Sequence, residues 1–147
     1  MVCWDECGKT EIVQIFVSHE KGKIKLIQFA YAEDGKVRLS QVHGDRDAAL
    51  NFDILKLDYP SEYLTSFSGH YDEDGFSIQF RTNKRFYRPF GSDEYHDYYD
   101  NDHSHRFKYE LDKQSFGGFH GAIHNNQVYT MGVYIKPVDS IGRSLKK

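Results

Sequence analysis

Three segments of this chain repeat one alternation of apolar and polar residues. Residues 22–31 read GKIKLIQFAY, residues 75–82 read GFSIQFRT and residues 127–135 read QVYTMGVYI. Each segment is rich in β-branched and aromatic residues and follows a turn-like stretch. Because a period of two puts alternate side chains on opposite faces, the pattern predicts antiparallel strands with one buried and one hydrated face. Three such units in one small chain predict three sheets that share one core.

Further alternating runs predict the remaining strands. They lie at residues 10–18, 36–42, 51–57, 62–71, 85–90, 107–111 and 116–120. Turn signals such as Asp34-Gly35 separate them. Within the strands, Phe119, Val133 and Ile135 are expected to lie in the core. No long stretch with a helical period is visible, so the sequence predicts an all-β domain.

Composition excludes several classes of protein. At 147 residues the chain is long enough for one domain with a substantial core. Aromatic residues make up 16% of it, which favours strands over helices. A net charge of −3 and a pI near 6.2 argue against a nucleic-acid partner, which requires a basic patch. No apolar run approaches the roughly eighteen residues that cross a bilayer, so no membrane partner is expected.

The first residues bear on where the protein works. Trp4, Asp5 and Glu6 interrupt any apolar run there, so no signal peptide is visible, and a cytoplasmic location is expected, with the nucleus left open. Cys3 and Cys7 are the only cysteines. A local disulfide is one interpretation of this pair, but free thiols are favoured in a reducing compartment.

Residues 92–105 form a low-complexity stretch, SDEYHDYYDNDHSH, that holds no basic residue. This composition predicts a long exposed loop. The calcium-binding pattern D-x-D-x-D-G is absent. His103 and His105 could ligate zinc from one strand face, but histidine pairs with this spacing are common in sequences without a metal site. A solvated loop is therefore favoured, and no metal or cofactor is expected. Its tyrosines suit a contact surface for a sugar or a protein.

Short motifs along the chain are shared, in the same order, with one family. They are Trp4-Asp5-Glu6, LDYPSEYLT at 57–65 followed by Gly69-His70-Tyr71, FRTNK at 80–84 followed by PFG at 89–91, and GFHG at 118–121 followed by MGVY at 131–134. With these motifs the chain resembles the jacalin-related lectins, in particular the mannose- or glucose-binding branch of plants. The resemblance covers residues 4 to about 136. Residues 1–136 are therefore expected to form the lectin domain and residues 137–147 a C-terminal tail.

The resemblance implies both a fold and a class of activity. The fold is a β-prism of the first type, in which three four-stranded Greek-key sheets surround one core with pseudo-threefold symmetry. The activity is carbohydrate binding without catalysis. The residues agree that the chain is no enzyme, because no G-x-S-x-G or other nucleophile context appears. His120 is expected to order a strand and its turn rather than to act as a base.

The resemblance also implies where sugar binds. In the family, a glycine-rich N-terminal stretch meets the turns before two of the repeated strands at one end of the prism. An aspartate three residues before the glycine of the G-V-Y run is the hallmark of that site. Here Tyr129 occupies the position, and no glycine-rich stretch precedes Trp4. The candidate carbohydrate-binding residues are Gly121, His124, Asn125, Asn126, Tyr129, Asp72 and Asp74.

Two interpretations of the 121–129 loop stay open. In one, Asn125 and Asn126 offer amide donors and acceptors, a ring of His124 or Tyr129 stacks on the sugar, and the aspartates bind paired hydroxyls. In the other, the two asparagines form a turn because asparagine tolerates left-handed backbone, and Tyr129 is an ordinary strand residue.

Two functions follow from these interpretations. A lectin for mannose- or glucose-type glycans would bind at a single site with roughly millimolar affinity, so useful avidity would need a homo-oligomer or a tandem array. The alternative is a β-prism that has lost sugar binding and contacts a protein partner through residues 92–105.

Overall fold

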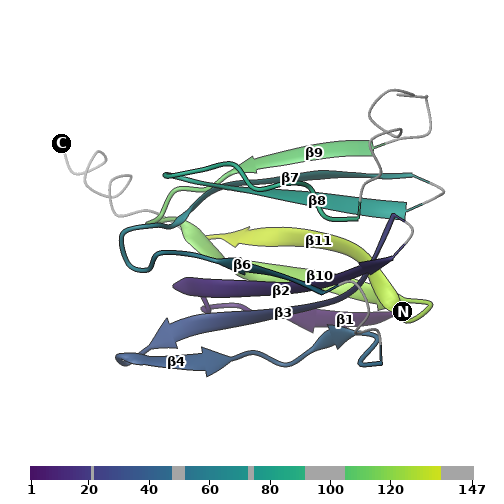
Figure 1. Ribbon diagram of the computed structural model, residues 1–147, viewed down its shortest axis with the longest axis horizontal. Coiled ribbons are helices and arrows are strands. Elements are labelled where there is room, and N and C mark those ends of the chain that lie inside the picture. The colour runs from purple at the N-terminus through teal and green to yellow at the C-terminus, as the bar shows by residue number, and fades with distance from the viewer. Residues whose placement is uncertain (21, 48–51, 73–74, 92–104, 137–147) are drawn as a thin grey trace.

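The computed structural model describes residues 1–20, 22–47, 52–72, 75–91 and 105–136. These residues form strands and no helix (Figure 1). The strands are β1 (Val2–Asp5), β2 (Ile12–Glu20), β3 (Lys23–Glu33), β4 (Lys36–Leu39), β5 (His43–Gly44), β6 (Phe52–Lys56), β7 (Leu64–Asp72), β8 (Gly75–Thr82), β9 (His105–Glu110), β10 (Phe116–His124) and β11 (Gln127–Ile135). No helix in the described part of the chain is long and apolar enough to cross a membrane.

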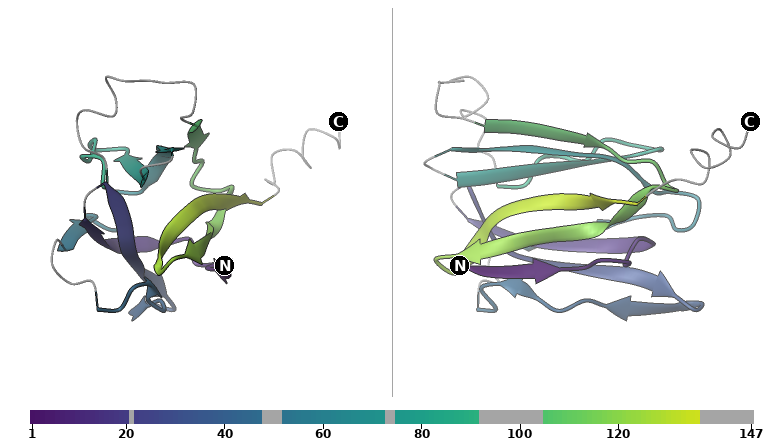
Figure 2. Two further views of the ribbon diagram at one scale, coloured as in Figure 1. Left: turned by 90° about the vertical axis from the view of Figure 1, so that its right-hand side faces the viewer. Right: turned by 180° about the vertical axis from the view of Figure 1, so that it is seen from behind.

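The strands form three antiparallel sheets that face a common centre (Figure 2). Their orders are β1-β10-β11, β4-β3-β2-β6 with β5 also paired to β3, and β8-β7-β9. The all-β prediction and the three-sheet arrangement are therefore confirmed. The sheets are less regular than three sets of four strands. β4 and β5 pair with successive parts of β3 and share one edge of their sheet.

The three repeated segments are equivalent strands of the fold. They are β3, β8 and β11, and each is the second strand of a hairpin whose first strand is β2, β7 or β10. β3, β8 and β11 also contact one another across the interior. The repeat in the sequence thus reflects one hairpin used once in each sheet.

A cluster of phenylalanines joins the three sheets at the core. Phe29 of β3 stacks on Phe119 of β10, with ring centroids 5.1 Å apart and planes inclined by 7°. Phe119 also meets Phe67 of β7 edge to face at 5.3 Å and Phe80 of β8 at 6.0 Å. All four side chains are at most 1% exposed. Burial of each ring stabilises the fold by about 1.5–3 kcal/mol, so this cluster is a main source of cohesion between the sheets.

Two predictions for segments at the edges of the β8-β7-β9 sheet differ from the structure. Residues 85–90, predicted as a strand, make only two isolated bridges with β8, at Ile78–Phe90 and Arg81–Phe86. Pro89 lies between these bridges and has no N–H to donate, which interrupts the ladder. His105, expected in the exposed loop, instead begins β9 and stacks on Tyr71 at 5.0 Å.

Other local predictions also meet corrections. β1 was not predicted as a strand, because four residues are too few to show an alternation. Phe119 lies in the core as predicted and Val133 packs against the core, but Ile135 is 58% exposed and the prediction for it is wrong. It is the last residue of β11, where one face of the strand is no longer covered. Cys3 and Cys7 are both free and exposed. Residues 92–104 and the predicted tail at 137–147 lie outside the described residues.

Candidate functional site

The β2–β3, β7–β8 and β10–β11 turns all lie at one end of the prism, together with the N-terminus (Figures 1 and 2). We call this the hairpin end. The β2–β3 turn is tightly connected there, through Gly91, to the start of β8. A Cβ on Gly22, in the β2–β3 turn, would lie 3.2 Å from the carbonyl oxygen of Gly91, and one on Gly91 would lie 2.5 Å from that of Phe76 in β8. Only glycines allow so close a backbone approach, so these positions fix how the turns converge.

The β10–β11 turn contains most of the candidate sugar-binding residues. His124 pairs with Gln127, which leaves Asn125 and Asn126 as a two-residue loop. Their φ angles are 51° and 60°, so both residues are left-handed, as a type I′ hairpin turn requires. Asparagine is one of the few residues that accepts this conformation readily. The structure therefore gives the two asparagines a clear conformational role, as the turn interpretation predicts.

The same turn exposes two aromatic side chains. Tyr129 is 50% exposed, and its ring meets that of His124 edge to face at a centroid distance of 5.4 Å. The exposed amides of Asn125 and Asn126 lie in the adjoining loop. An aromatic ring beside amide groups offers an apolar face together with donors and acceptors, which is the combination that a pyranose ring requires.

Gly121 lies away from this exposed surface. It sits inside β10, opposite Trp4 of β1, and it is buried. A Cβ there would lie 2.6 Å from the Trp4 ring and 2.5 Å from the carbonyl oxygen of Thr130. Its role in the structure is to make room for the indole ring that packs against β10.

A buried polar pair holds the N-terminal strand in place beside the candidate turn. Trp4 stacks on His43 at 4.2 Å, and His43 Nε2 lies 2.6 Å from Glu6 Oε1. Both members of the His43–Glu6 pair are buried, and Lys9 Nζ lies 3.4 Å from the other oxygen of Glu6. Because Val2 pairs with Ile123, these contacts place the chain start next to the β10–β11 turn.

The aspartates of the β7–β8 turn are only partly described. Asp72 is the last residue of β7 and pairs with Gly75, so it lies at the hairpin end. Asp74 lies outside the described residues. The sequence offered no reason to include the segment after β5, yet Asp45 lies at the same end, because its N–H donates to the Lys25 carbonyl at the start of β3. Only the register of β5 against β3 reveals that position.

Comparison with known proteins identifies the family of this chain. Residues 2–134 match the sequence profile described as the jacalin-like lectin domain. This chain belongs to the jacalin-like lectin family. In Arabidopsis thaliana, the protein RESTRICTED TEV MOVEMENT 1 is 36% identical over 145 residues, which cover 93% of this chain and 79% of that protein. Jacalin-related lectin 2 of the same plant is 36% identical over 146 residues, covering 93% of this chain and 78% of that protein.

Solved structures of lectins share the fold. Frutalin from Artocarpus incisa in complex with galactose superposes with a TM-score of 0.72 at 24% identity, covering 93% of this chain and all (100%) of frutalin. Jacalin in complex with the T-antigen gives a TM-score of 0.73, also at 24% identity and with the same coverage, 93% and 100%. These likenesses confirm the β-prism of the first type.

Parts of two motifs shared with the jacalin-related lectins, LDYPSEYLT and FRTNK, lie at the opposite end of the prism. We call it the far end, and it consists of residues 57–63 before β7 and residues 82–87, from the last residue of β8 onward. Glu62 is fully buried there, at 0% exposure. Its carboxylate accepts hydrogen bonds from the Asp58 N–H at 2.8 Å, the Thr82 hydroxyl at 2.6 Å and the Tyr87 hydroxyl at 3.0 Å. Arg85 adds two more, from Nε at 3.0 Å and Nη2 at 3.2 Å.

This network changes the protonation equilibria of its members. Burial alone would raise the pKa of Glu62, but the hydrogen bonds from Thr82, Asp58 and Tyr87 and the charge of Arg85 outweigh it and lower the pKa. Burial and the neighbouring carboxylate raise the pKa of Tyr87 to about 12. Glu62 is therefore a charged and fully hydrogen-bonded brace between two chain segments rather than a group available to a ligand.

Proposed function

We propose that this domain binds neutral glycans of the mannose or glucose type at the hairpin end, without catalysis. Membership of a carbohydrate-binding family supports the general activity. The single observation that carries the location is the exposed Tyr129 ring, set against His124 and beside the amides of Asn125 and Asn126. That surface offers both the stacking face and the donors and acceptors that sugar hydroxyls need.

The expected affinity is low because of the residue at position 129. A carboxylate can accept hydrogen bonds from two neighbouring hydroxyls at once, whereas a phenol offers one hydroxyl. We expect a single-site dissociation constant of roughly 1 mM, which corresponds to about −4 kcal/mol. Useful binding would then depend on several linked sites, in a homo-oligomer or in tandem domains.

An NMR titration with methyl α-mannoside, methyl α-glucoside and methyl α-galactoside tests the proposal. Saturable shifts of the backbone amides at 123–129, with mannoside or glucoside preferred, are the expected result. Tyr129→Ala should abolish them and leave the fold intact, because the side chain is half exposed. Gln114→Ala, in the exposed β9–β10 connection, is the matched control and should bind as the parent does. No shift at 100 mM sugar would overturn the proposal.

A second candidate function is contact with a protein. Myrosinase-binding protein 1 of Arabidopsis thaliana is 30% identical over 142 residues, which cover 92% of this chain and 28% of that protein, and its name states a protein ligand. In this chain, the outer face of the β4-β3-β2-β6 sheet exposes Val37, Leu39, Phe52 and Ile54, at 44–65%. The tyrosines of residues 92–105 remain a second proposed contact surface for a protein partner. This function would be favoured if the domain bound no sugar but bound a protein, and if Phe52→Ser or Ile54→Ser abolished the binding of that protein.

A further inference from the structure

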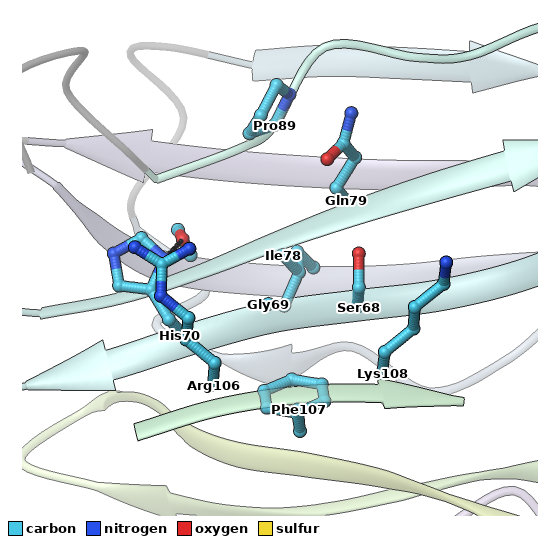
Figure 3. A pocket seen from close by; sticks show the side chains of 10 residues that line it. Ser68, Gly69, His70, Ile78, Gln79, Pro89, Arg106, Phe107 and Lys108 are labelled. Atoms are coloured by element: carbon cyan, nitrogen blue, oxygen red, sulfur yellow. Dashed lines mark hydrogen bonds between the residues drawn. The ribbon is translucent and has the colours of Figure 1, made fainter. Parts of the chain in front are cut away.

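A concavity lies on the outer face of the β8-β7-β9 sheet, which is a different sheet from that of the β10–β11 turn. It has a volume of about 490 Å³ and is open to solvent (Figure 3). Its lining includes the side chains of Ser68, His70, Ser77, Gln79, Arg106 and Lys108. All six are polar, and no aspartate or glutamate is among the described residues that line the concavity.

The strand register explains why these residues gather on one face. Phe67 of β7 and Ile78 of β8 are fully buried, so the residues that alternate with them point outward. Pairing then aligns the outward residues in two rows across the sheet. Arg106, His70 and Ser77 form one row, and Lys108, Ser68 and Gln79 form the other. Each row therefore begins with a cation on β9 and ends with a neutral polar group on β8.

Several of these groups are already oriented. The Ser77 hydroxyl lies 3.0 Å from His70 Nδ1. Gln79 Nε2 donates to the Tyr87 carbonyl at 3.1 Å, which directs its amide oxygen as an acceptor. Lys108 Nζ lies 3.1 Å from Glu110, but both side chains are more than half exposed, and such a surface pair contributes little. Lys108 can therefore turn toward a ligand at small cost. In Figure 3 its side chain lies beside Ser68.

The chemistry of the two rows selects a class of ligand. Two cations on one rim favour a sulfate or carboxylate group, which accepts charge-assisted hydrogen bonds. The hydroxyl of Ser68 and the amide of Gln79 suit alcohol groups, which both donate and accept. Among the described residues of the lining, Phe107 packs against the core and the His70 ring lies beside Ser77, so no exposed phenyl, phenol or indole ring is available for stacking. A neutral sugar would thus bind poorly here, and the charge must supply most of the affinity.

We propose that this concavity is a second carbohydrate site, for saccharides that carry a sulfate or carboxylate group. It is independent of the hairpin end, so either site can fail without the other. A phosphorylated peptide suits the position less well. The concavity lies over β7, which is already paired on both edges with β8 and β9, so an extended peptide cannot add a strand there.

The test is an NMR titration of the whole chain with four probes. They are a sulfated tetrasaccharide from heparin, a trigalacturonate, the neutral mannotriose and sodium sulfate. Saturable shifts at residues 68–70, 77–79 and 106–108 with the first or second probe are expected, and which of the two binds tighter distinguishes sulfate from carboxylate. Binding should weaken as salt rises, because the attraction is electrostatic and exposed.

Variants assign the contact to the two cations. Lys108→Gln and Arg106→Gln should each weaken the binding of the acidic saccharide about fivefold or more, as loss of a charge-assisted hydrogen bond predicts. Lys36→Gln, at another exposed lysine, on the β4-β3-β2-β6 sheet, is the matched control and should change nothing. All three substitutions are on the surface, so thermal unfolding should stay as in the parent.

Three results would overturn the proposal. Sodium sulfate that binds as tightly as the tetrasaccharide would reduce the site to one for simple anions. A phosphoserine peptide that displaces the saccharide at lower concentration would assign the concavity to a protein ligand. Shifts confined to residues 123–129 would show that all saccharide binding belongs to the hairpin end.

Discussion

The two ends of this prism are built from different chemistry. At the far end, one buried carboxylate receives hydrogen bonds from four residues, Asp58, Thr82, Arg85 and Tyr87. At the hairpin end, Asn125 and Asn126 are exposed in a left-handed turn, and half of Tyr129 faces solvent. The carboxylate at the far end is buried and fully satisfied, whereas the hairpin end leaves polar groups available. The motifs shared with a family can thus mark its scaffold, while the proposed ligand contacts lie in a turn where this chain departs from the family pattern.

Removal of the Glu62 side chain should have the largest effect on stability. Glu62→Ala leaves the hydroxyls of Thr82 and Tyr87 without their acceptor and the Arg85 guanidinium without its partner. The Arg85 side chain is 52% exposed and can be hydrated, so the cost comes mainly from the two hydroxyls, at about 1–3 kcal/mol for each one left unsatisfied, and urea unfolding monitored by fluorescence would measure it. Glu110→Ala, at a side chain that is 75% exposed, should stay within about 0.5 kcal/mol of the parent. Equal losses in the two variants would contradict the contrast between the ends.

The same residue should make stability depend on pH in a defined direction. The pKa of Glu62 in the folded protein lies below its ordinary value of 4.5, so the unfolded chain binds its proton more readily. Its contribution is therefore complete above pH 4.5 and is lost as the pH falls through the lower folded value. The free energy of unfolding of Glu62→Gln, measured as a function of pH, should not show this loss of stability in acid. If the variant lost as much stability in acid as the parent does, the effect would belong to other carboxyl groups.

Gly121→Ala should cost less than the loss of Glu62 but should change the candidate site indirectly. The added Cβ would lie 2.6 Å from the Trp4 ring, so β1 or β10 must shift. Such overpacking costs about 1–3 kcal/mol, measurable by urea unfolding. Trp4→Leu combined with Gly121→Ala should lose less than the sum of the two single changes, because the shorter side chain removes the contact with the ring, while the 2.5 Å approach to the Thr130 carbonyl oxygen remains. Strict additivity would show that Trp4 and Gly121 do not interact.

The turn itself separates conformation from ligand binding. Asn125→Ala should destabilise the protein by about 1–2 kcal/mol, because alanine resists a positive φ. Asn126→Gly accepts the same backbone and should leave the unfolding midpoint nearly unchanged. If the Asn126 amide binds sugar, this glycine variant should lose the mannoside shifts while it keeps its stability. Retained shifts would mean that Asn126 serves the turn alone.

The sequence predicted the scaffold better than the site for physical reasons. Alternation over eight to eleven residues specifies β3, β8 and β11, because a slip of one residue would expose a whole apolar face. Proximity across the fold leaves no such pattern. Neither the cover of Trp4 over Gly121 nor the rows that join Lys108 to Ser68 can be read from spacing, since each depends on the register between strands. The turn at Asn125 and Asn126 could be predicted locally, because asparagine tolerates left-handed backbone, and the structure has the turn at these residues.

The smallest expected effect concerns a contact between β1 and β11, the two outer strands of one sheet. The Tyr134 hydroxyl donates to Asp5 Oδ2 at 2.8 Å, and the Cys7 N–H donates to Oδ1 at 2.7 Å. The bond from Tyr134 is the largest cause that lowers the pKa of Asp5 below its ordinary value of 3.8, and it raises the pKa of Tyr134 in turn.

Tyr134→Phe should therefore raise the pKa of Asp5 toward 3.8, as followed by the carboxyl carbon shift in an NMR titration. The unfolding midpoint should change little, because the Asp5 carboxylate is exposed and solvent screens its interactions. The Cys7 N–H still donates to Asp5 in the variant, so the pKa should stay somewhat below the ordinary value. A large loss of stability would instead show that this exposed pair braces β1 against β11 as firmly as Glu62 braces the far end.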